Sequence, residues 1–277
     1  MLTQSNVQKF QQYIFGWYER YGRHTLPWRQ TTDPYHILVS ELMLQQTQVE
    51  RVIPKYLTFL KTFPTITHLS HASLAEVLTL WQGLGYNRRA KFLWLAAKEV
   101  DEKWEGEFPN TLESLLTLPG IGPYTASAVS VFAFNNPEIV IETNIRTIYL
   151  HHFFPDDTKI SDTTILPLIS QTLWHQNPRE WYAALMDYGS HLKKAVPNPS
   201  RKSQHHSKQS KFEGSLRQVR GEILRLLTQH QKLSEDILRK KIEGNKLYFD
   251  SSIAALKKEK LIFLINDFYT LHQTIST

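Results

Sequence analysis

Apolar residues in the first 192 positions recur at intervals of three and four, which is the periodicity of helices. Proline or glycine interrupts the pattern at short spacings, and the alternation typical of strands is scarce. We therefore predict an all-α fold for this part of the chain. The predicted helices are residues 7–21, 34–42, 48–63, 74–81, 87–100, 111–117, 124–134, 143–153 and 181–191.

The pattern changes after residue 192. Residues 197–214 have many small polar side chains and little apolar periodicity, which is typical of a linker or an arm. Predicted helices follow at residues 215–229, 234–242 and 250–260, and then come two strand-like runs, LIFLI and FYTLH, separated by Asn266 and Asp267. Three helices followed by a hairpin predict a small winged-helix-like α/β domain. The alternative is a small helical cap that packs on the first domain.

Charge is distributed in agreement with this division. Residues 1–192 carry 15 basic and 18 acidic side chains, whereas the remaining residues carry 17 and 8. The highest density lies in residues 193–220, where eight Lys or Arg face only Glu213. Such a composition favours contact with phosphates, although a solvated linker has the same character. We predict three parts: residues 1–192, a basic arm at 193–214, and a winged-helix-like domain at 215–277.

Composition excludes several classes of protein. The chain has no cysteine, so disulfides, thiolate zinc sites and cysteine-ligated iron-sulfur clusters are excluded, and the histidines show no compact ligand spacing. No run of about 18 apolar residues occurs, and the first residues lack the pattern of a secretory signal. We expect a soluble cytoplasmic monomer, associated with the nucleoid if the host is prokaryotic, without contact to membranes.

The segment LPGIGPYTA at residues 118–126 predicts a tight turn between two helices. Gly120 and Gly122 can adopt positive φ, which lets backbone N–H groups approach a phosphate. The backbone of such a hairpin can also accept a monovalent cation. Glycine ends many helices for structural reasons alone, so the turn needs the support of other motifs.

Several further motifs occur in a fixed order around this turn. They are LPWR (26–29), SELMLQQTQV (40–49), LWQGLGYNRRA (80–90), IETNIR (141–146) and ALMDYGS (184–190). With the hairpin, they resemble the helix-hairpin-helix-GPD superfamily of DNA glycosylases, and most of all the MutY-type adenine DNA glycosylases. The resemblance covers roughly residues 24–192, and it implies two helical lobes and a double-stranded DNA substrate with a mismatched or damaged base.

The resemblance implies roles for four residues. Glu41 protonates the departing adenine, and its apolar flanks favour a raised pKa. Glu142 stands where the family has an aspartate that stabilises the oxocarbenium-like sugar. Tyr124 occupies the position of the nucleophilic lysine in bifunctional relatives that resemble endonuclease III, which implies a monofunctional enzyme, and Asn144 orients the catalytic groups. Glu142 keeps the negative charge of the family's aspartate but is longer by one methylene group. Either the backbone position compensates for this length, or the activity is altered.

A base in a duplex must rotate out of the stack to reach such a pocket. The resemblance implies that Gln46, in QQTQ, and the ring of Tyr86 occupy the stack beside the opposing base, and that Gln45 also contacts the substrate or the DNA. Leu26, Trp28 and Arg29 are expected to line the base pocket, although Trp28 is equally compatible with an ordinary core position.

The chain departs from the family in two further respects. It lacks the four cysteines that usually follow the segment matching ALMDYGS, and we expect the basic arm with Lys193, Lys194, Arg201 and Lys202 to contact DNA in place of that cluster loop. The C-terminal part is too short for the Nudix-like module that reads 8-oxoguanine. Two alternatives therefore remain open: a glycosylase for thymine or uracil opposite guanine, and a non-catalytic DNA-binding relic.

Overall fold

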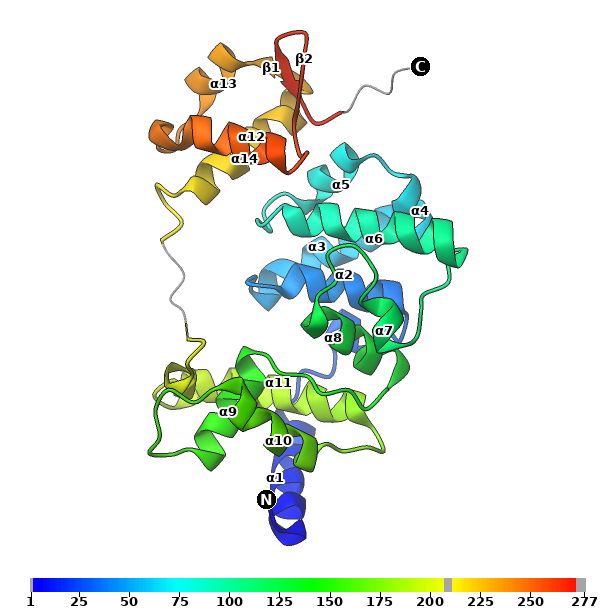
Figure 1. Ribbon diagram of the computed structural model, residues 1–277, viewed down its shortest axis with the longest axis vertical. Helices are drawn as coiled ribbons and strands as arrows, with labels where there is room; N and C mark the ends of the chain where they lie inside the picture. The colour runs from blue at the N-terminus through cyan, green and yellow to red at the C-terminus, as the bar shows by residue number, and fades with distance from the viewer. Residues whose placement is uncertain (1, 207–210, 273–277) are drawn as a thin grey trace. The chain divides into compact units, whose positions relative to one another are not determined.

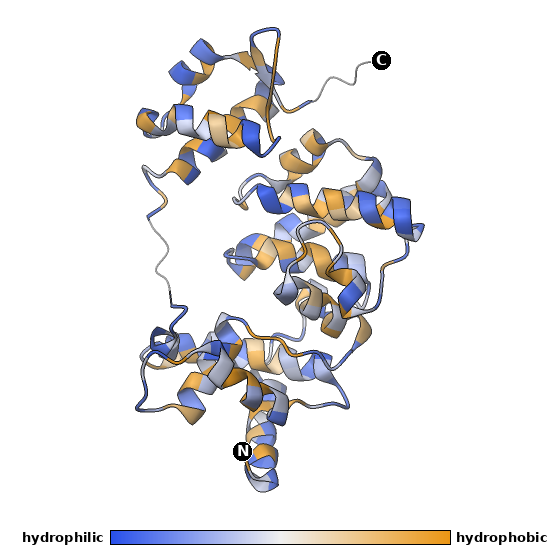
Figure 2. Ribbon diagram, viewed as in Figure 1, coloured by the Kyte–Doolittle hydropathy of each residue, from blue (hydrophilic) through white to orange (hydrophobic). Residues whose placement is uncertain are grey.

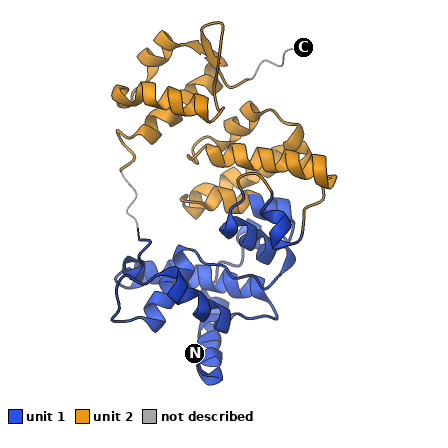
Figure 3. Cartoon of the chain, in the orientation of Figure 1, with its two compact units in different colours: residues 1–38, 110–117, 121–208 blue, residues 39–109, 118–120, 209–277 orange. Residues whose placement is uncertain are grey.

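The computed structural model describes residues 2–206 and 211–272, which form two compact units. Unit 1 comprises residues 1–38, 110–117 and 121–208, and unit 2 comprises residues 39–109, 118–120 and 209–277 (Figure 3). Each unit combines segments that are distant in the sequence. The division of the chain at residues 192 and 214 stays a prediction.

Unit 1 is built from helices (Figure 1). Its elements are α1 (Gln4–Tyr21), η1 (Pro27–Arg29), α7 (Leu112–Leu115), α8 (Pro123–Phe134), α9 (Thr143–Phe153), α10 (Asp162–Thr172), α11 (Pro178–Ala195) and η2 (Pro199–Lys202). Helix α11 packs against α9, α1 and α8, and α10 packs against α1 and α9. The fully buried rings of Trp181, Tyr149 and Tyr182 fill the space between these helices. Aromatic burial of this size supplies much of the stability of such a unit.

Helix α2 (Pro34–Leu44) continues from unit 1 into unit 2. The other helices of the first part of unit 2 are α3 (Val49–Thr62), α4 (Ile66–His71), α5 (Leu74–Trp81) and α6 (Arg88–Trp104). Helix α6 packs against α4 and α5, and Phe59 and Trp81 lie in the core between α3 and α5 with an edge-to-face contact. Most helices of the chain carry both hydrophobic and hydrophilic residues, as expected when one side faces a core (Figure 2).

The C-terminal segment of unit 2 has the winged-helix arrangement predicted from the sequence. Its elements are α12 (Leu216–His230), β1 (Lys232–Ser234), α13 (Glu235–Lys241), η3 (Lys246–Tyr248), α14 (Phe249–Lys258), β2 (Phe263–Ile265) and β3 (Phe268–Thr270). The strands form an antiparallel sheet in the order β1-β3-β2, in which Tyr269 pairs with both Leu233 and Leu264. The predicted fold class, a helical chain with a small C-terminal α/β part, is confirmed.

The described residues contain two helices that the apolar pattern did not predict, α4 and α10. Helix α10 contains Pro167 in its interior, whereas the sequence pattern favours a proline at a helix boundary. A proline removes one backbone donor, a loss that tertiary packing can offset. No helix in residues 2–206 or 211–272 is both long and apolar enough to cross a lipid bilayer.

Candidate active site

The turn between α7 and α8 contains the two hairpin glycines, Gly120 and Gly122. Gly120 has a φ of 73°, and a Cβ atom there would lie 2.2 Å from Cγ of Phe92, so both conformation and space require glycine. Gly122 differs from the prediction, because its φ of −89° is ordinary extended backbone. A Cβ atom on Gly122 would meet nothing within 4 Å, and Pro123 opens α8 beside this free space. An anion can therefore approach the N-terminus of α8.

Glu41 lies on α2 and is buried, with a relative exposure of 7%. Its neighbours Val39, Leu42 and Met43 on the same helix are also buried. These buried neighbours form the apolar setting that the sequence predicted around Glu41.

Arg89 connects the helix that carries Glu41 to the loop that carries Tyr86. The side chain is buried on α6, and its guanidinium donates six hydrogen bonds to the end of α2 and to the loop before α6. The acceptors are the carbonyl oxygens of Leu42, Met43, Gln45, Leu84 and Gly85, and Oγ1 of Thr47. Burial lowers the pKa of Arg89 to about 10, so the group stays charged at neutral pH.

Two residues predicted to enter the base stack have strained backbone. Gln46 has a φ of 53° and Tyr86 a φ of 48°, both in the left-handed region that non-glycine residues rarely adopt. Both side chains are exposed. Strain of this kind persists only where the surrounding structure imposes it, and it is concentrated at functional sites. At Tyr86, the guanidinium of Arg89 imposes this conformation, because it donates a hydrogen bond to the carbonyl oxygen of the preceding residue, Gly85.

Glu142 is the N-cap of α9. One carboxylate oxygen accepts the backbone N–H groups of Asn144 at 2.6 Å and Ile145 at 2.9 Å, and the other accepts Nδ2 of Asn144 at 3.2 Å. The Oδ1 atom of Asn144 is buried, and no described residue donates a hydrogen bond to it. The first turn of α9 therefore fixes Glu142 and Asn144 in place, and Oδ1 of Asn144 can accept a hydrogen bond from a further donor.

Burial raises the pKa of Glu142, and the two backbone hydrogen bonds and the charges of Lys193 and Arg146 oppose this effect. Burial also lowers the pKa of Lys193, which the charge of Glu142 opposes. Lys193 is half-buried on α11, so its ammonium group contributes positive potential near Glu142.

Gly189 sets the distance between α11 and the start of α9. A Cβ atom at Gly189 would lie 2.1 Å from the carbonyl oxygen of Asn144. The neighbour is backbone, which cannot rotate away. Close contact of the two helices at this point therefore depends on glycine.

Gly189→Ala is expected to lower the free energy of unfolding by about 1–3 kcal/mol, because the added methyl group overpacks a backbone contact. Urea unfolding measures this. The matched control is Gly16→Ala on α1, where an added Cβ atom would meet nothing within 4 Å. Alanine should stabilise the helix there by about 0.5–1 kcal/mol. A Gly189→Ala protein as stable as the original chain would contradict the close contact.

Asp187, in the motif ALMDYGS, is a buried acid that is not among the predicted site residues. Its carboxylate accepts Nη2 of Arg23 at 2.6 Å and the backbone N–H of Arg23 at 2.7 Å, and Nη2 of Arg29 lies 3.7 Å away. The Nη1 atom of Arg29 is buried, and no described residue accepts a hydrogen bond from it. Leu26 and Trp28 are buried nearby in the sequence. Burial of an acid at this position is a signal that only the tertiary structure reveals.

A cavity of about 210 Å³ lies beside Arg29 in unit 1. Ala183 lines it, together with Tyr18, His24, Gln30, Asn177, Arg179 and Glu180. The Nη2 atom of Arg179 donates to the carbonyl oxygens of Arg29 and Thr31. The predicted pocket residue Arg29 therefore lies at a mostly polar cavity.

The four basic residues proposed for the arm do not share one environment. Lys194 and Arg201 are exposed, whereas Lys193 is half-buried and Nζ of Lys202 donates to the carbonyl oxygens of Phe154 and Pro155. Residues 199–202 form η2, which packs on α9. The first part of the arm is thus ordered against unit 1, and residues 207–210 lie outside the described residues.

The predicted site residues are distributed over both units. Unit 2 contains Glu41, Gln45, Gln46, Tyr86 and Gly120, and unit 1 contains Glu142, Asn144, Tyr124, Gly122, Leu26, Trp28, Arg29, Lys193, Lys194, Arg201 and Lys202. Tyr124 lies at the start of α8 and is half-buried. Within the part of the chain that the structure describes, no group of three His, Asp or Glu side chains could hold a metal ion.

The chain is similar to proteins of base excision repair. A family model described as HhH-GPD superfamily base excision DNA repair protein matches residues 39–172. The chain is 39% identical over 187 residues to the adenine DNA glycosylase of Buchnera aphidicola subsp. Baizongia pistaciae, covering 65% of this chain and 52% of that protein. It is 37% identical over 179 residues to the adenine DNA glycosylase of Mycolicibacterium smegmatis, covering 64% and 61%.

The chain spans about half the length of the curated relatives that it matches. Solved structures share the fold. A thermostable thymine-DNA glycosylase superposes with a TM-score of 0.61 at 23% identity, covering 72% of this chain and 91% of that chain. Endonuclease III in a non-covalent DNA complex superposes with a TM-score of 0.58 at 17% identity, covering 74% and 97%.

Proposed function

Because residues 39–172 match the model of the HhH-GPD superfamily of base excision DNA repair proteins, we propose that the chain is a monofunctional DNA N-glycosylase. Its substrate is adenine mispaired with 8-oxoguanine or guanine in double-stranded DNA, by analogy with relatives named adenine DNA glycosylase. The observation that carries the proposal is Glu41, a carboxyl group buried in an apolar stretch of helix within the matched family region.

The proposed reaction cleaves the bond between the base and the sugar. Glu41 gives its proton to a ring nitrogen of adenine, and the base then leaves with the bonding electron pair. Glu142 stabilises the positive charge that develops on the sugar, and a water molecule adds to the anomeric carbon and loses its proton. The products are free adenine and an abasic site. Asn144 holds the Glu142 carboxylate in place through Nδ2.

Single-turnover cleavage of four duplexes tests the function. Adenine opposite 8-oxoguanine, adenine opposite guanine, thymine opposite guanine and uracil opposite guanine are compared, with alkali added to reveal abasic sites. Excision of adenine alone supports the proposal. Excision of thymine or uracil instead would show that the substrate is not adenine. Tight binding without any excision would favour a non-catalytic DNA-binding protein.

Strand breaks are expected only after treatment with alkali, because Tyr124 has no amine with which to form a Schiff base. Borohydride added during the reaction should trap no covalent protein–DNA complex. The measurement is a denaturing gel of adenine duplexes with and without alkali, and Tyr124→Lys serves as the comparison. A trapped complex with the original chain would show that another amine attacks the sugar.

DNA binding is expected to use the N-terminus of α8 and the exposed basic residues Lys194 and Arg201. Affinity should fall steeply with salt, since each neutralised phosphate releases counterions. We propose that the enzyme acts as a monomer in the cytoplasm and needs no iron-sulfur cluster, and that the hairpin backbone is the site for any monovalent cation.

A further inference from the structure

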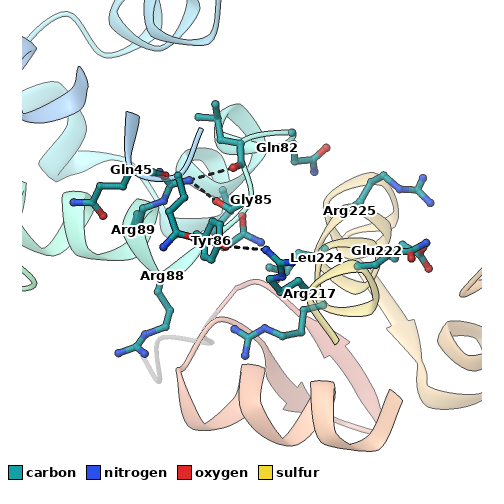
Figure 4. Close-up of a pocket in the computed structure, with 18 of the residues that line it drawn as sticks. Gln45, Gln82, Gly85, Tyr86, Arg88, Arg89, Arg217, Glu222, Leu224 and Arg225 are labelled. Atoms are coloured by element: carbon teal, nitrogen blue, oxygen red, sulfur yellow. Dashed lines mark hydrogen bonds between the residues drawn. The ribbon is translucent and has the colours of Figure 1, made fainter. Parts of the chain in front are cut away.

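A groove of about 1230 Å³ lies in unit 2, between the loop before α6 and helix α12 of the C-terminal segment (Figure 4). Gln45 and Gln46 also line it. Unit 2 thus has a large open site to which the glycosylase part and the winged-helix segment both contribute.

The groove is strongly positive. Two glutamates, Glu222 and Glu259, line it together with six arginines: Arg51, Arg88, Arg89, Arg217, Arg220 and Arg225. Both glutamates are engaged. Glu259 is paired with Arg220 at 2.5 Å, and a Glu222 oxygen accepts the backbone N–H groups of Glu243 at 3.1 Å and Gly244 at 3.0 Å.

Three of the arginines have no acidic partner. Across residues 2–206 and 211–272, Arg51, Arg88 and Arg225 form no ion pair, and all three are exposed. A groove with a surplus of guanidinium groups is suited to a ligand with several phosphates.

An aromatic ring projects into the same groove. The Tyr86 ring lies between two guanidinium groups, with the Cζ atoms of Arg89 and Arg217 at 5.4 Å and 5.8 Å from its centroid (Figure 4). Nη1 of Arg217 also donates to the Tyr86 hydroxyl at 2.8 Å. The ring remains 37% exposed. The ring therefore connects Arg89 on α6 to Arg217 on α12.

We propose that the arginines of this groove, including those of the C-terminal segment, bind the phosphates of one DNA strand. Arg217, from the C-terminal segment, positions the Tyr86 ring and contacts the backbone. This inference rests on the proposed function only in taking DNA as the ligand. It assigns to the winged-helix segment a direct part in holding the strand.

Arg217→Ala in the full chain is expected to weaken binding about tenfold and to reduce the salt slope of log Kd by about 0.9, the value for one lost phosphate contact. Binding is measured by fluorescence anisotropy on a duplex with a tetrahydrofuran abasic-site analogue, which the enzyme cannot cleave. Arg225→Ala is the second variant. Lys240→Ala is the matched control, because it removes one exposed positive charge of the same segment outside the groove.

Loss of affinity in both arginine variants but not in Lys240→Ala supports the site. Equal affinities in all variants would overturn it, and so would equal losses in all three, which would indicate general attraction. Thermal unfolding shows whether each variant is folded. Because this assay needs no excision, it separates failure of the groove from failure of the proposed reaction.

Neutral methylphosphonates at single positions in each strand identify the contact. Where Arg217 touches a phosphate, the substitution should weaken binding of the original chain about tenfold and leave Arg217→Ala unaffected. If the losses add independently at every position of both strands, Arg217 does not contact the backbone and the proposal is wrong.

Discussion

Glu41→Gln is expected to lower single-turnover excision of adenine by about 10²–10⁴-fold, the range that general acid catalysis contributes. Glutamine has nearly the same shape as glutamate and fits the same buried position on α2, but it cannot deliver a proton to the departing base. Affinity for the uncleavable duplex should be unchanged. The measurement is the rate of excision with enzyme in excess over DNA.

The matched control for this change is Glu50→Gln. Glu50 is an exposed glutamate in the first turn of α3, so the same substitution there should leave the rate unaltered. If Glu41→Gln excised adenine as fast as the original chain, Glu41 would not be the general acid. A loss in Glu50→Gln as well would show that a general change in charge is responsible.

Glu142→Gln is expected to lower the excision rate by about 10²–10³-fold, because it removes the negative charge that stabilises the developing sugar cation. Glutamine keeps an oxygen that can accept the backbone N–H groups of Asn144 and Ile145, so the cap of α9 is preserved. Glu142→Asp retains the charge and should be more active than Glu142→Gln. If the glutamine variant were as fast as the original, the charge would have no part in the reaction.

The same substitution should have the opposite effect on stability. Burial raises the pKa of Glu142 above its ordinary value, so the stability contributed by its protonated form is present at low pH and is lost as pH rises through the raised pKa. Glutamine does not titrate. Between about pH 5 and about pH 8, the thermal midpoint of Glu142→Gln should therefore rise relative to that of the original chain. A difference that is constant over this range would contradict the raised pKa.

The sequence predicts helices best where local capping and apolar spacing agree. Residues 74–81 and 143–153 were predicted with the bounds that the structure shows. The first of these helices has a capping box of Ser73 and Glu76, and the second is capped by Glu142. Helix α4 has only six residues, too few for a periodic pattern, and α10 contains a proline. Strand β1 has three residues and is defined by its pairing with β3 rather than by its own composition.

The candidate site shows the same limit. Glu41, Glu142 and the hairpin glycines are visible in sequence because they lie in short specific motifs. Asp187 and Arg89 lie in such motifs too, but their importance follows from partners elsewhere in the chain. Asp187 holds Arg23, and Arg89 binds carbonyl groups at the end of α2. Backbone carbonyl groups carry no residue identity, so no sequence pattern predicts which of them a buried arginine will meet.

The hydrogen bonds of Arg89 also constrain how this chain can change. One side chain fixes both the segment after Glu41 and the turn before Tyr86, so an insertion or deletion in either segment would displace the other. The two motifs can diverge only together. A substitution of Arg89 should therefore displace the segment after Glu41 and the turn before Tyr86 together.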